Sequence, residues 1–140
     1  MFLLDTNVVC ELRKPRPHGA VLAWLHSVDD VDLHLAAVTL AEIQAGIEMT
    51  REQDRANAAE IEAWVDLVER SYNVLPMDGK TFRIWARLMH RKSNALYEDA
   101  MIAATAQAHQ LTVVTRNVKD FAHFEVQFLN PFGAAKGRSR

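Results

Sequence analysis

The residues of this sequence best suited to chemistry are four acids and an amide, namely Asp5, Glu42, Asp99, Asp120 and Asn117. Carboxylates gathered in one place repel one another, and their pKa values rise unless a cation joins them. Oxygen ligands from carboxylates, an amide and water are the ones that Mg²⁺ and Mn²⁺ prefer. If the fold brings these side chains together, we expect a Mg²⁺ site at which Mn²⁺ can substitute.

Each of these residues also has an ordinary structural interpretation. Asp5 can cap the helix that follows it, and Glu42 can complete a capping box in the segment Thr39-Leu40-Ala41-Glu42. Asp99 suits the first turn of a helix because the helix dipole favours acids there. Asn117 and Asp120 are common turn residues. Taken singly, each of these residues is explained by local structure. Their relative placement in the fold must therefore decide between separate structural roles and a shared metal site.

The bulk composition limits the possible functions. The chain has 140 residues, of which 49% are hydrophobic and 24% charged, as in one globular domain. A net charge of −2 gives the whole molecule no long-range attraction to nucleic acid. The six histidines are scattered without zinc-ligand spacing, and the five glycines form no phosphate-binding loop. Any nucleic-acid contact must therefore come from local basic groups.

Cys10 is the only cysteine of the sequence. It excludes an internal disulfide and suits a reducing compartment, so we expect a cytoplasmic protein. We also expect Cys10 to be a small buried side chain on the first helix. No apolar run approaches the length of a membrane span, so no membrane association is expected.

The elements that must position the acids alternate between strand and helix. Short apolar runs predict strands over residues 2–4, 31–37, 73–76, 111–115 and 126–129. Helical periodicity predicts helices over 6–12, 18–28, 52–71 and 80–91, another opening at Thr39, and a nearly all-apolar one containing 100–106. This alternation predicts an α/β fold, a three-layer α/β/α sandwich with a mostly parallel central sheet of four to five strands.

The sequence contains no linker or repeat, so we expect one domain over residues 1–132. The small, basic segment 133–140 is expected to be a flexible C-terminal tail. The helices after the second predicted strand are expected to form a hairpin arm.

The predicted topology gathers the acids at one edge of the sheet. Asp5 ends the first strand, Glu42 lies on the first turn after the second, and Asn117 and Asp120 follow the fourth. The carboxyl ends of parallel strands share the edge where α/β proteins bind ligands. Asp99 reaches the same edge if its helix begins there and runs back to feed the fourth strand. This placement favours a shared site over separate structural roles.

Four motifs, in this order, resemble those of PIN-domain ribonucleases. They are Leu3-Leu4-Asp5-Thr6-Asn7, Thr39-Leu40-Ala41-Glu42, Tyr97 to Ala106, and Leu111 to Phe121. More narrowly, the chain resembles VapC-type toxins of type II toxin–antitoxin systems, in the FitB-like branch, from Phe2 to about Pro131. The resemblance implies a PIN-like sandwich and a toxin that acts as a Mg²⁺-dependent endoribonuclease, leaving a 5′-phosphate and a 3′-hydroxyl.

The resemblance implies that Asp5, Glu42 and Asp99 are the catalytic acids that hold the metal. A fourth ligand falls in the turn after the fourth strand, where Asn117 and Asp120 both remain candidates. A second set of residues is suited to fixing the carboxylates by hydrogen bonds, namely Thr6, Asn7 and Thr115.

Positive charge for RNA lies in loops and at helix ends, at Arg13, Lys14, Arg16, Arg91, Lys92, Arg116 and Lys119. Arg13, Lys14, Arg116 and Lys119 are the main candidates for RNA contacts. Ordinary solvated surface is the alternative for each of them.

The resemblance also implies partners. Besides an RNA substrate, it implies a VapB-like antitoxin whose C-terminal segment lies across the active-site groove. It implies a homodimer as well, with a higher assembly in the antitoxin complex. Two other functions remain open from the sequence: a catalytically weak partner that acts with its antitoxin as a co-repressor, and a DNA-directed nuclease of the same fold.

Overall fold

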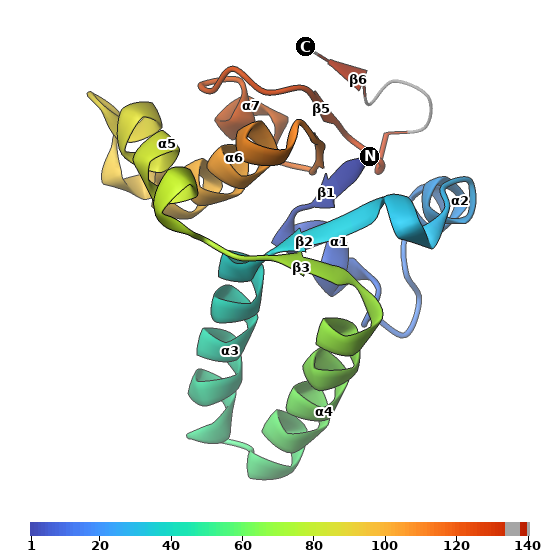
Figure 1. Ribbon diagram of the computed structural model, residues 1–140. Helices are drawn as coiled ribbons and strands as arrows, with labels where there is room; N and C mark the ends of the chain where they lie inside the picture. The colour runs from blue at the N-terminus through green and yellow to red at the C-terminus, as the bar shows by residue number, and fades with distance from the viewer. Residues whose placement is uncertain (134–137, 140) are drawn as a thin grey trace.

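The computed structural model describes residues 1–133 and 138–139. Strands and helices alternate along the chain (Figure 1). The strands are β1 (Phe2–Leu4), β2 (Leu33–Ala36), β3 (Asn73–Leu75), β4 (Thr112–Val114), β5 (Phe128–Leu129) and β6 (Arg138–Ser139). The α-helices are α1 (Thr6–Glu11), α2 (Gly19–His26), α3 (Ala37–Arg51), α4 (Arg55–Ser71), α5 (Gly79–Met89), α6 (Tyr97–His109) and α7 (Val118–Phe121). Single 3₁₀ turns lie at η1 (Asp30–Asp32) and η2 (Asn94–Leu96).

The strands form one sheet in the order β3-β2-β1-β4-β5-β6. The first five strands of that order pair in parallel, which confirms the predicted, mostly parallel sheet. At the edge, β6 pairs antiparallel with β5 and was not predicted. The boundary between a domain over 1–132 and a flexible tail over 133–140 stays a prediction, since 134–137 and 140 lie outside the described residues.

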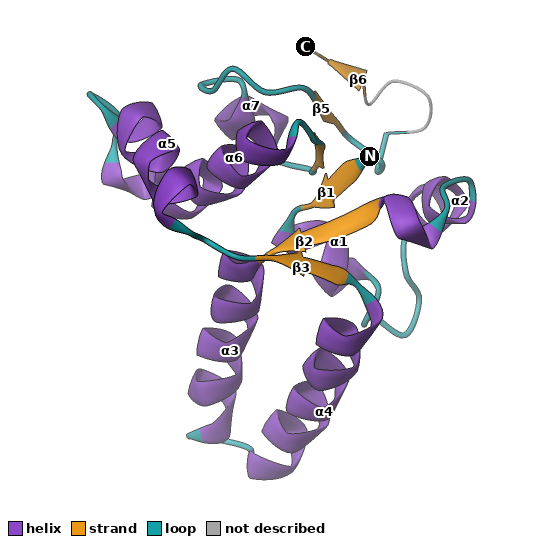
Figure 2. Ribbon diagram, in the orientation of Figure 1, coloured by secondary structure: helices purple, strands orange, loops and turns teal. Residues whose placement is uncertain are grey.

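Helices cover both faces of the sheet, so the predicted three-layer sandwich is confirmed (Figure 2). Successive strand residues point to opposite faces. Leu4 and Val114 belong to the core under α1 to α4, whereas Leu3 and Val113 belong to the core under α6 and α7. All four side chains are completely buried. Burial on both faces explains why these strands are apolar runs without polar alternation.

The helices α3 and α4 pack side by side as the predicted hairpin arm, which projects from the sheet in Figure 1. Hydrogen bonds and ion pairs between polar side chains connect the two helices. Arg51 donates to Glu62 on α4 at 2.9 Å and pairs with Glu48 on its own helix at 3.1 Å. Gln44 donates to Glu62 at 2.9 Å as well. Because α3 also carries Glu42, the arm is tied to the predicted site.

Two local predictions are corrected by the structure. The helix α3 begins at Ala37 rather than Thr39, and its N-cap Ala36 makes no side-chain capping bond. The chain passes directly from β2 into the helix, so Thr39 and Glu42 lie inside it and form no capping box. The segment expected to be a polar turn after β4 contains the short helix α7.

Cys10 is exposed, which overturns its predicted burial. The completely buried positions of α1 are occupied by Val8 and Val9 instead. Among the described residues, no helix is both long enough and apolar enough to cross a membrane.

Shortening a buried side chain of the sheet should destabilise the protein strongly. Leu35 on β2 is completely buried, so Leu35→Ala should lower the free energy of unfolding by about 2–5 kcal/mol through lost burial and a residual cavity. Leu67 on α4 is 55% exposed, so the control Leu67→Ala should change it by only about 0.5 kcal/mol. Urea unfolding measures both, and equal effects would contradict the assigned core.

Candidate active site

Asp5 is the most buried acid of the predicted set, with 3% of its surface exposed. Its Oδ1 accepts from the Thr6 backbone N–H at 2.7 Å, so it does cap α1. Its Oδ2 accepts from the Thr115 hydroxyl at 2.7 Å and from the Asn7 amide at 3.0 Å. A carboxylate has about four acceptor positions. Capping therefore leaves room for a further ligand, and the two interpretations of Asp5 are compatible.

The residues predicted to support the acids are themselves held by the backbone. The Asn7 Oδ1 accepts from the Arg116 N–H at 3.2 Å, and the Thr115 Oγ1 accepts from the Asn117 N–H at 2.9 Å. These bonds join the start of α1 to the loop after β4. Asp5 is thus fixed from two neighbouring strands of the sheet.

Glu42 lies on the second turn of α3 and faces α1. The Thr6 hydroxyl donates to its Oε1 at 2.7 Å and lies 3.1 Å from the Thr39 hydroxyl oxygen. Burial raises the pKa of Glu42, and the charges of Glu98 and Asp5 raise it further, against the Thr6 hydrogen bond that lowers it. Thr6 therefore links Glu42 to the segment that carries Asp5.

Asp99 and Asp120 complete the group of acids. Asp99 lies in the first turn of α6, and burial, the charge of Asp5 and a hydrogen bond with Asp120 raise its pKa to about 7. The charges of Asp120 and Glu42 act in the same direction. The structure thus brings four acids into one electrostatic neighbourhood, which we call the acidic cluster: Asp5, Glu42, Asp99 and Asp120. Asn117 is exposed and contacts this region through its backbone.

Among the described residues, no basic side chain makes an ion pair with the acidic cluster. Burial raises the pKa of Asp5 more than its three hydrogen bonds lower it, and the charge of Asp120 adds to the rise. The ion pairs found within the described part of the chain involve Glu11, Glu48 and Glu62, none of which belongs to the cluster. The negative charge gathered here favours binding of a cation.

The donor atoms of the acidic cluster fit a hard divalent cation by their chemistry. All four acids offer carboxylate oxygens, which are the ligands that Mg²⁺ takes. Within residues 1–133 and 138–139, no three His, Cys, Asp or Glu side chains are arranged closely enough to hold one ion directly. Because Mg²⁺ retains several waters and takes only one or two carboxylates, this spacing is compatible with a hydrated ion.

The four basic candidates for RNA contacts are all exposed: Arg13, Lys14, Arg116 and Lys119. Lys14 is engaged by Glu11, at 2.9 Å between Nζ and Oε1. The Arg116 guanidinium lies over the ring of Phe132, with its carbon 3.8 Å from the ring centroid.

Glu11 and Phe132, which contact two of these basic residues, were not predicted from the sequence to belong near the site. Glu11 is 5% exposed and also accepts from the His18 N–H at 2.9 Å. Its position on the apolar helix α1, three residues before Lys14, was a usable signal. Phe132 had none, because its contact with Arg116 joins residues distant in the chain.

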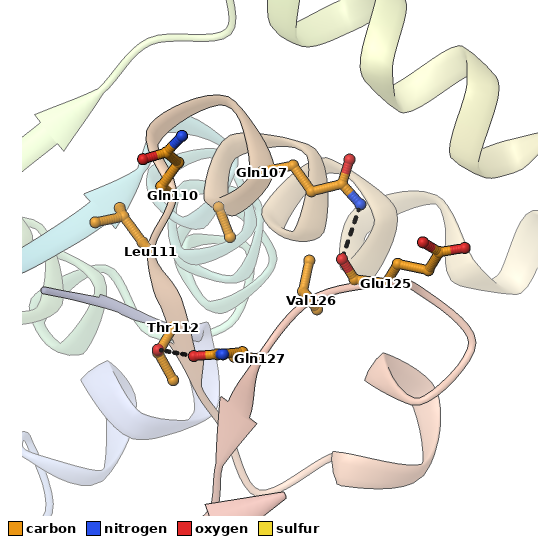
Figure 3. Close-up of a pocket in the computed structure, with 8 residues that line it drawn as sticks. Gln107, Gln110, Leu111, Thr112, Glu125, Val126 and Gln127 are labelled. Atoms are coloured by element: carbon orange, nitrogen blue, oxygen red, sulfur yellow. Dashed lines mark hydrogen bonds between the residues drawn. The ribbon is translucent and has the colours of Figure 1, made fainter. Parts of the chain in front are cut away.

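Hollows lie at different places on the fold, and two of them differ in how close they lie to the acids. One, of about 280 Å³, extends from Thr6 and Glu42 past Cys10 along the apolar residues Ile43 and Trp64. The other, of about 540 Å³, lies at the amino end of β4, away from the acidic cluster (Figure 3). Its polar groups already bond one another: Gln107 to the Glu125 carbonyl at 3.2 Å, and Thr112 to Gln127 at 3.4 Å. The first hollow therefore adjoins the candidate site.

A family model described as the PIN domain matches residues 2–126. The chain belongs to the PIN-domain family. It is 34% identical to Toxin FitB of Neisseria gonorrhoeae, over 94% of this chain and 99% of that protein. It is 36% identical to a VapC ribonuclease of Sinorhizobium fredii, over 96% of this chain and 100% of that protein.

A solved structure of FitAcB from Neisseria gonorrhoeae has a TM-score of 0.80 against this PIN domain. The two chains are 34% identical, over 95% of this chain and 99% of that one. These likenesses confirm the predicted resemblance to VapC-type toxins of the FitB-like branch. In this PIN domain Asp5 directly follows β1, and Asp5, Glu42 and Asp120 all raise the pKa of Asp99; the metal-binding role of these acids stays a prediction.

The acidic cluster should make the stability of the metal-free PIN domain depend on pH. The pKa of Asp99 is about 7 in the folded protein, whereas the ordinary pKa of an aspartate side chain is 3.8. Between these values the folded state keeps a proton that the unfolded state has lost, so the free energy of unfolding should fall as pH rises. One proton accounts for at most about 1.4 kcal/mol per pH unit, and partial solvent screening reduces it.

Urea unfolding at a series of pH values in EDTA measures this slope. The variant Asp99→Asn should flatten it, whereas Asp66→Asn, at an exposed position on α4, should leave it unchanged. A slope that Asp99→Asn does not alter would contradict the coupling of Asp99 to the cluster.

Proposed function

We propose that this PIN-domain protein is the toxin of a type II toxin–antitoxin system and acts as a Mg²⁺-dependent endoribonuclease. The observation that carries this proposal is the acidic cluster at the carboxyl edge of the sheet, in which several carboxylates raise the pKa of Asp99. The likeness to proteins named Toxin FitB and VapC ribonuclease supports the substrate class.

In this proposal Asp5 and Asp99 bind the metal, and Glu42 and Asp120 complete its surroundings. The influence of Asp120 on the pKa of Asp99 supports Asp120 over Asn117 as the fourth acidic position, since the Asn117 contact with this region is made by its backbone. The remaining acceptor capacity of Asp5, beside its three donors, supports a direct ligand role. Mn²⁺ is expected to substitute for Mg²⁺ because it takes the same oxygen ligands.

When bound, such an ion polarises a phosphodiester oxygen and lowers the pKa of a water. The chain's own residues orient the acids for this task. Thr6 holds the Glu42 Oε1 at 2.7 Å, which leaves the other carboxylate oxygen of Glu42 to accept a proton from water. Thr115 and Asn7 fix the Asp5 Oδ2. Arg13, Lys14, Arg116 and Lys119 are proposed to contact RNA phosphates, since they are exposed beside the acids.

A cognate VapB-like antitoxin is the proposed protein partner. A relative 34% identical to this chain has been solved as FitAB bound to a DNA fragment, which supports a paired second component here. The hollow of about 280 Å³ beside Thr6 and Glu42 is lined by apolar and polar groups. An antitoxin segment lying there would cover the acidic cluster and inhibit it.

Loss of the Asp5 carboxylate should abolish RNA cleavage. We expect Asp5→Asn to reduce Mg²⁺-dependent cleavage by more than about 100-fold, because residues that merely support metal ligands already cost about 10- to 100-fold. Asp66→Asn removes the same charge from an exposed helix position and should retain activity. The assay compares purified proteins on tRNA, mRNA, single-stranded DNA and duplex DNA.

Equal RNA cleavage by the parent and Asp5→Asn would refute the nuclease assignment to this site. Cleavage of DNA alone would make the protein a DNA-directed PIN-like nuclease. Absence of cleavage, together with antitoxin-dependent operator binding, would make it a catalytically weak co-repressor instead.

Metal binding should also be visible without catalysis. An ion that binds only the folded state stabilises it by about 2.7 kcal/mol at 100 times its dissociation constant, so Mg²⁺ should raise the melting temperature of the parent at pH 8. Asp99→Asn should lose most of that rise. Glu48→Gln, on the hairpin arm, should keep it. An equal rise in all three proteins would show that Mg²⁺ binds elsewhere.

A further inference from the structure

The Arg116 side chain is ordered by an aromatic ring. Its guanidinium carbon lies 3.8 Å from the centroid of the Phe132 ring. Phe132 in turn packs against the core under α1 to α4. The His18 ring meets Phe132 edge-on, with centroids 5.4 Å apart and planes inclined at 68°. Three residues distant in sequence thus form one layered surface, which we call the Arg116 platform: Arg116, Phe132 and His18.

The platform adjoins the acidic cluster through the backbone. Arg116 directly follows Thr115, whose hydroxyl donates to Asp5 at 2.7 Å. Its own N–H donates to the Asn7 Oδ1 at 3.2 Å, and the Asn7 amide donates to Asp5 at 3.0 Å. The base of the Arg116 side chain is therefore fixed one residue from the acids.

The charge of Arg116 remains available for a ligand. Within the described residues Arg116 makes no ion pair, and its charge lowers the pKa of Glu11 less than the hydrogen bond from Lys14 does. Glu11 already makes an ion pair with Lys14 at 2.9 Å and accepts from the His18 N–H. Arg116 is an exposed residue although one face of its guanidinium lies on Phe132. Part of the Arg116 side chain therefore contacts solvent while it lies on the ring.

We propose that the Arg116 platform stacks a nucleobase of single-stranded RNA beside the phosphate that is cleaved. A planar cation held over an aromatic ring presents a flat surface, and bases stack on both guanidinium planes and aromatic rings. Since Phe132 holds the guanidinium in advance, less conformational entropy is lost when a base binds. The inference rests on the proposed RNA cleavage and adds to it a subsite that reads the base rather than the phosphate.

Base stacking and a simple phosphate contact make different demands on Arg116. A phosphate contact needs only the positive charge, which Arg116→Lys retains. Stacking needs the planar guanidinium, which lysine lacks, and the ring beneath it, which Phe132→Leu removes. Lys119→Gln is the matched control, because it removes one exposed positive charge from the neighbouring helix α7 without changing a residue of the platform.

Fluorescence anisotropy with two labelled probes separates these cases. The probes are a single-stranded oligoadenylate and an abasic oligomer with the same ribose–phosphate backbone, and all proteins carry Asp99→Asn so that neither probe is cut. Arg116→Lys and Phe132→Leu should each weaken oligoadenylate binding by at least about 5-fold, the low end for one stacked base, with the abasic affinity nearly unchanged. Lys119→Gln should weaken both probes alike.

Equal binding of oligoadenylate by Arg116→Lys and its parent would overturn the platform, as would equal losses on both probes or no oligoadenylate binding by the parent. Phe132→Leu removes part of the core packing, so Arg116→Lys, which leaves that ring in place, decides the matter if Phe132→Leu is unfolded. Cleavage by the protein with Asp99 intact is measured separately. If the protein cuts no RNA but Arg116→Lys still weakens binding of oligoadenylate and not of the abasic probe, the proposed nuclease activity is wrong and the proposed stacking platform stands.

Discussion

The buried carboxylate of Asp5 is the constraint on which the rest of the structure depends. A charge that is 3% exposed is costly unless it is hydrogen-bonded, and a hydrogen bond to a charged group contributes about 1.5–3 kcal/mol. Thr6, Asn7 and Thr115 supply those bonds. Because the donors come from α1 and from the end of β4, satisfying one acid also fixes the join between the two central strands of the sheet.

The other acids destabilise the folded state, because their carboxylates are partly buried and repel one another. Burial and mutual charge raise the pKa values of Glu42 and Asp99, and no ion pair of the described residues relieves the cluster. Packing on both faces of the sheet holds this unfavourable arrangement in position. Proteins accept such local conflict mainly at functional sites. A cation that joined the acids would remove this repulsion, which is the physical reason for the metal site that we propose.

The sequence predicted those features that depend on neighbouring residues or on parallel topology. The buried strands β1 and β4 were recognisable as short apolar runs, and parallel pairing was enough to bring the acids to one edge. The predicted start of α3 was wrong because the Thr39 hydroxyl contacts Thr6 in the tertiary structure and does not cap the helix. The stacking of Arg116 on Phe132 could not be predicted, since no pattern in the chain links them.

The choice between Asn117 and Asp120 depends on the path of the chain after β4. As a turn, the segment leaves both side chains equally able to reach the acids. Instead it forms α7, a helix of 4 residues with Asn117 as its N-cap. That helix carries Asp120, which contributes to the raised pKa of Asp99, while the Asn117 N–H donates to the Thr115 hydroxyl oxygen. We therefore propose Asp120, which lies on this short helix, as the fourth acid of the site.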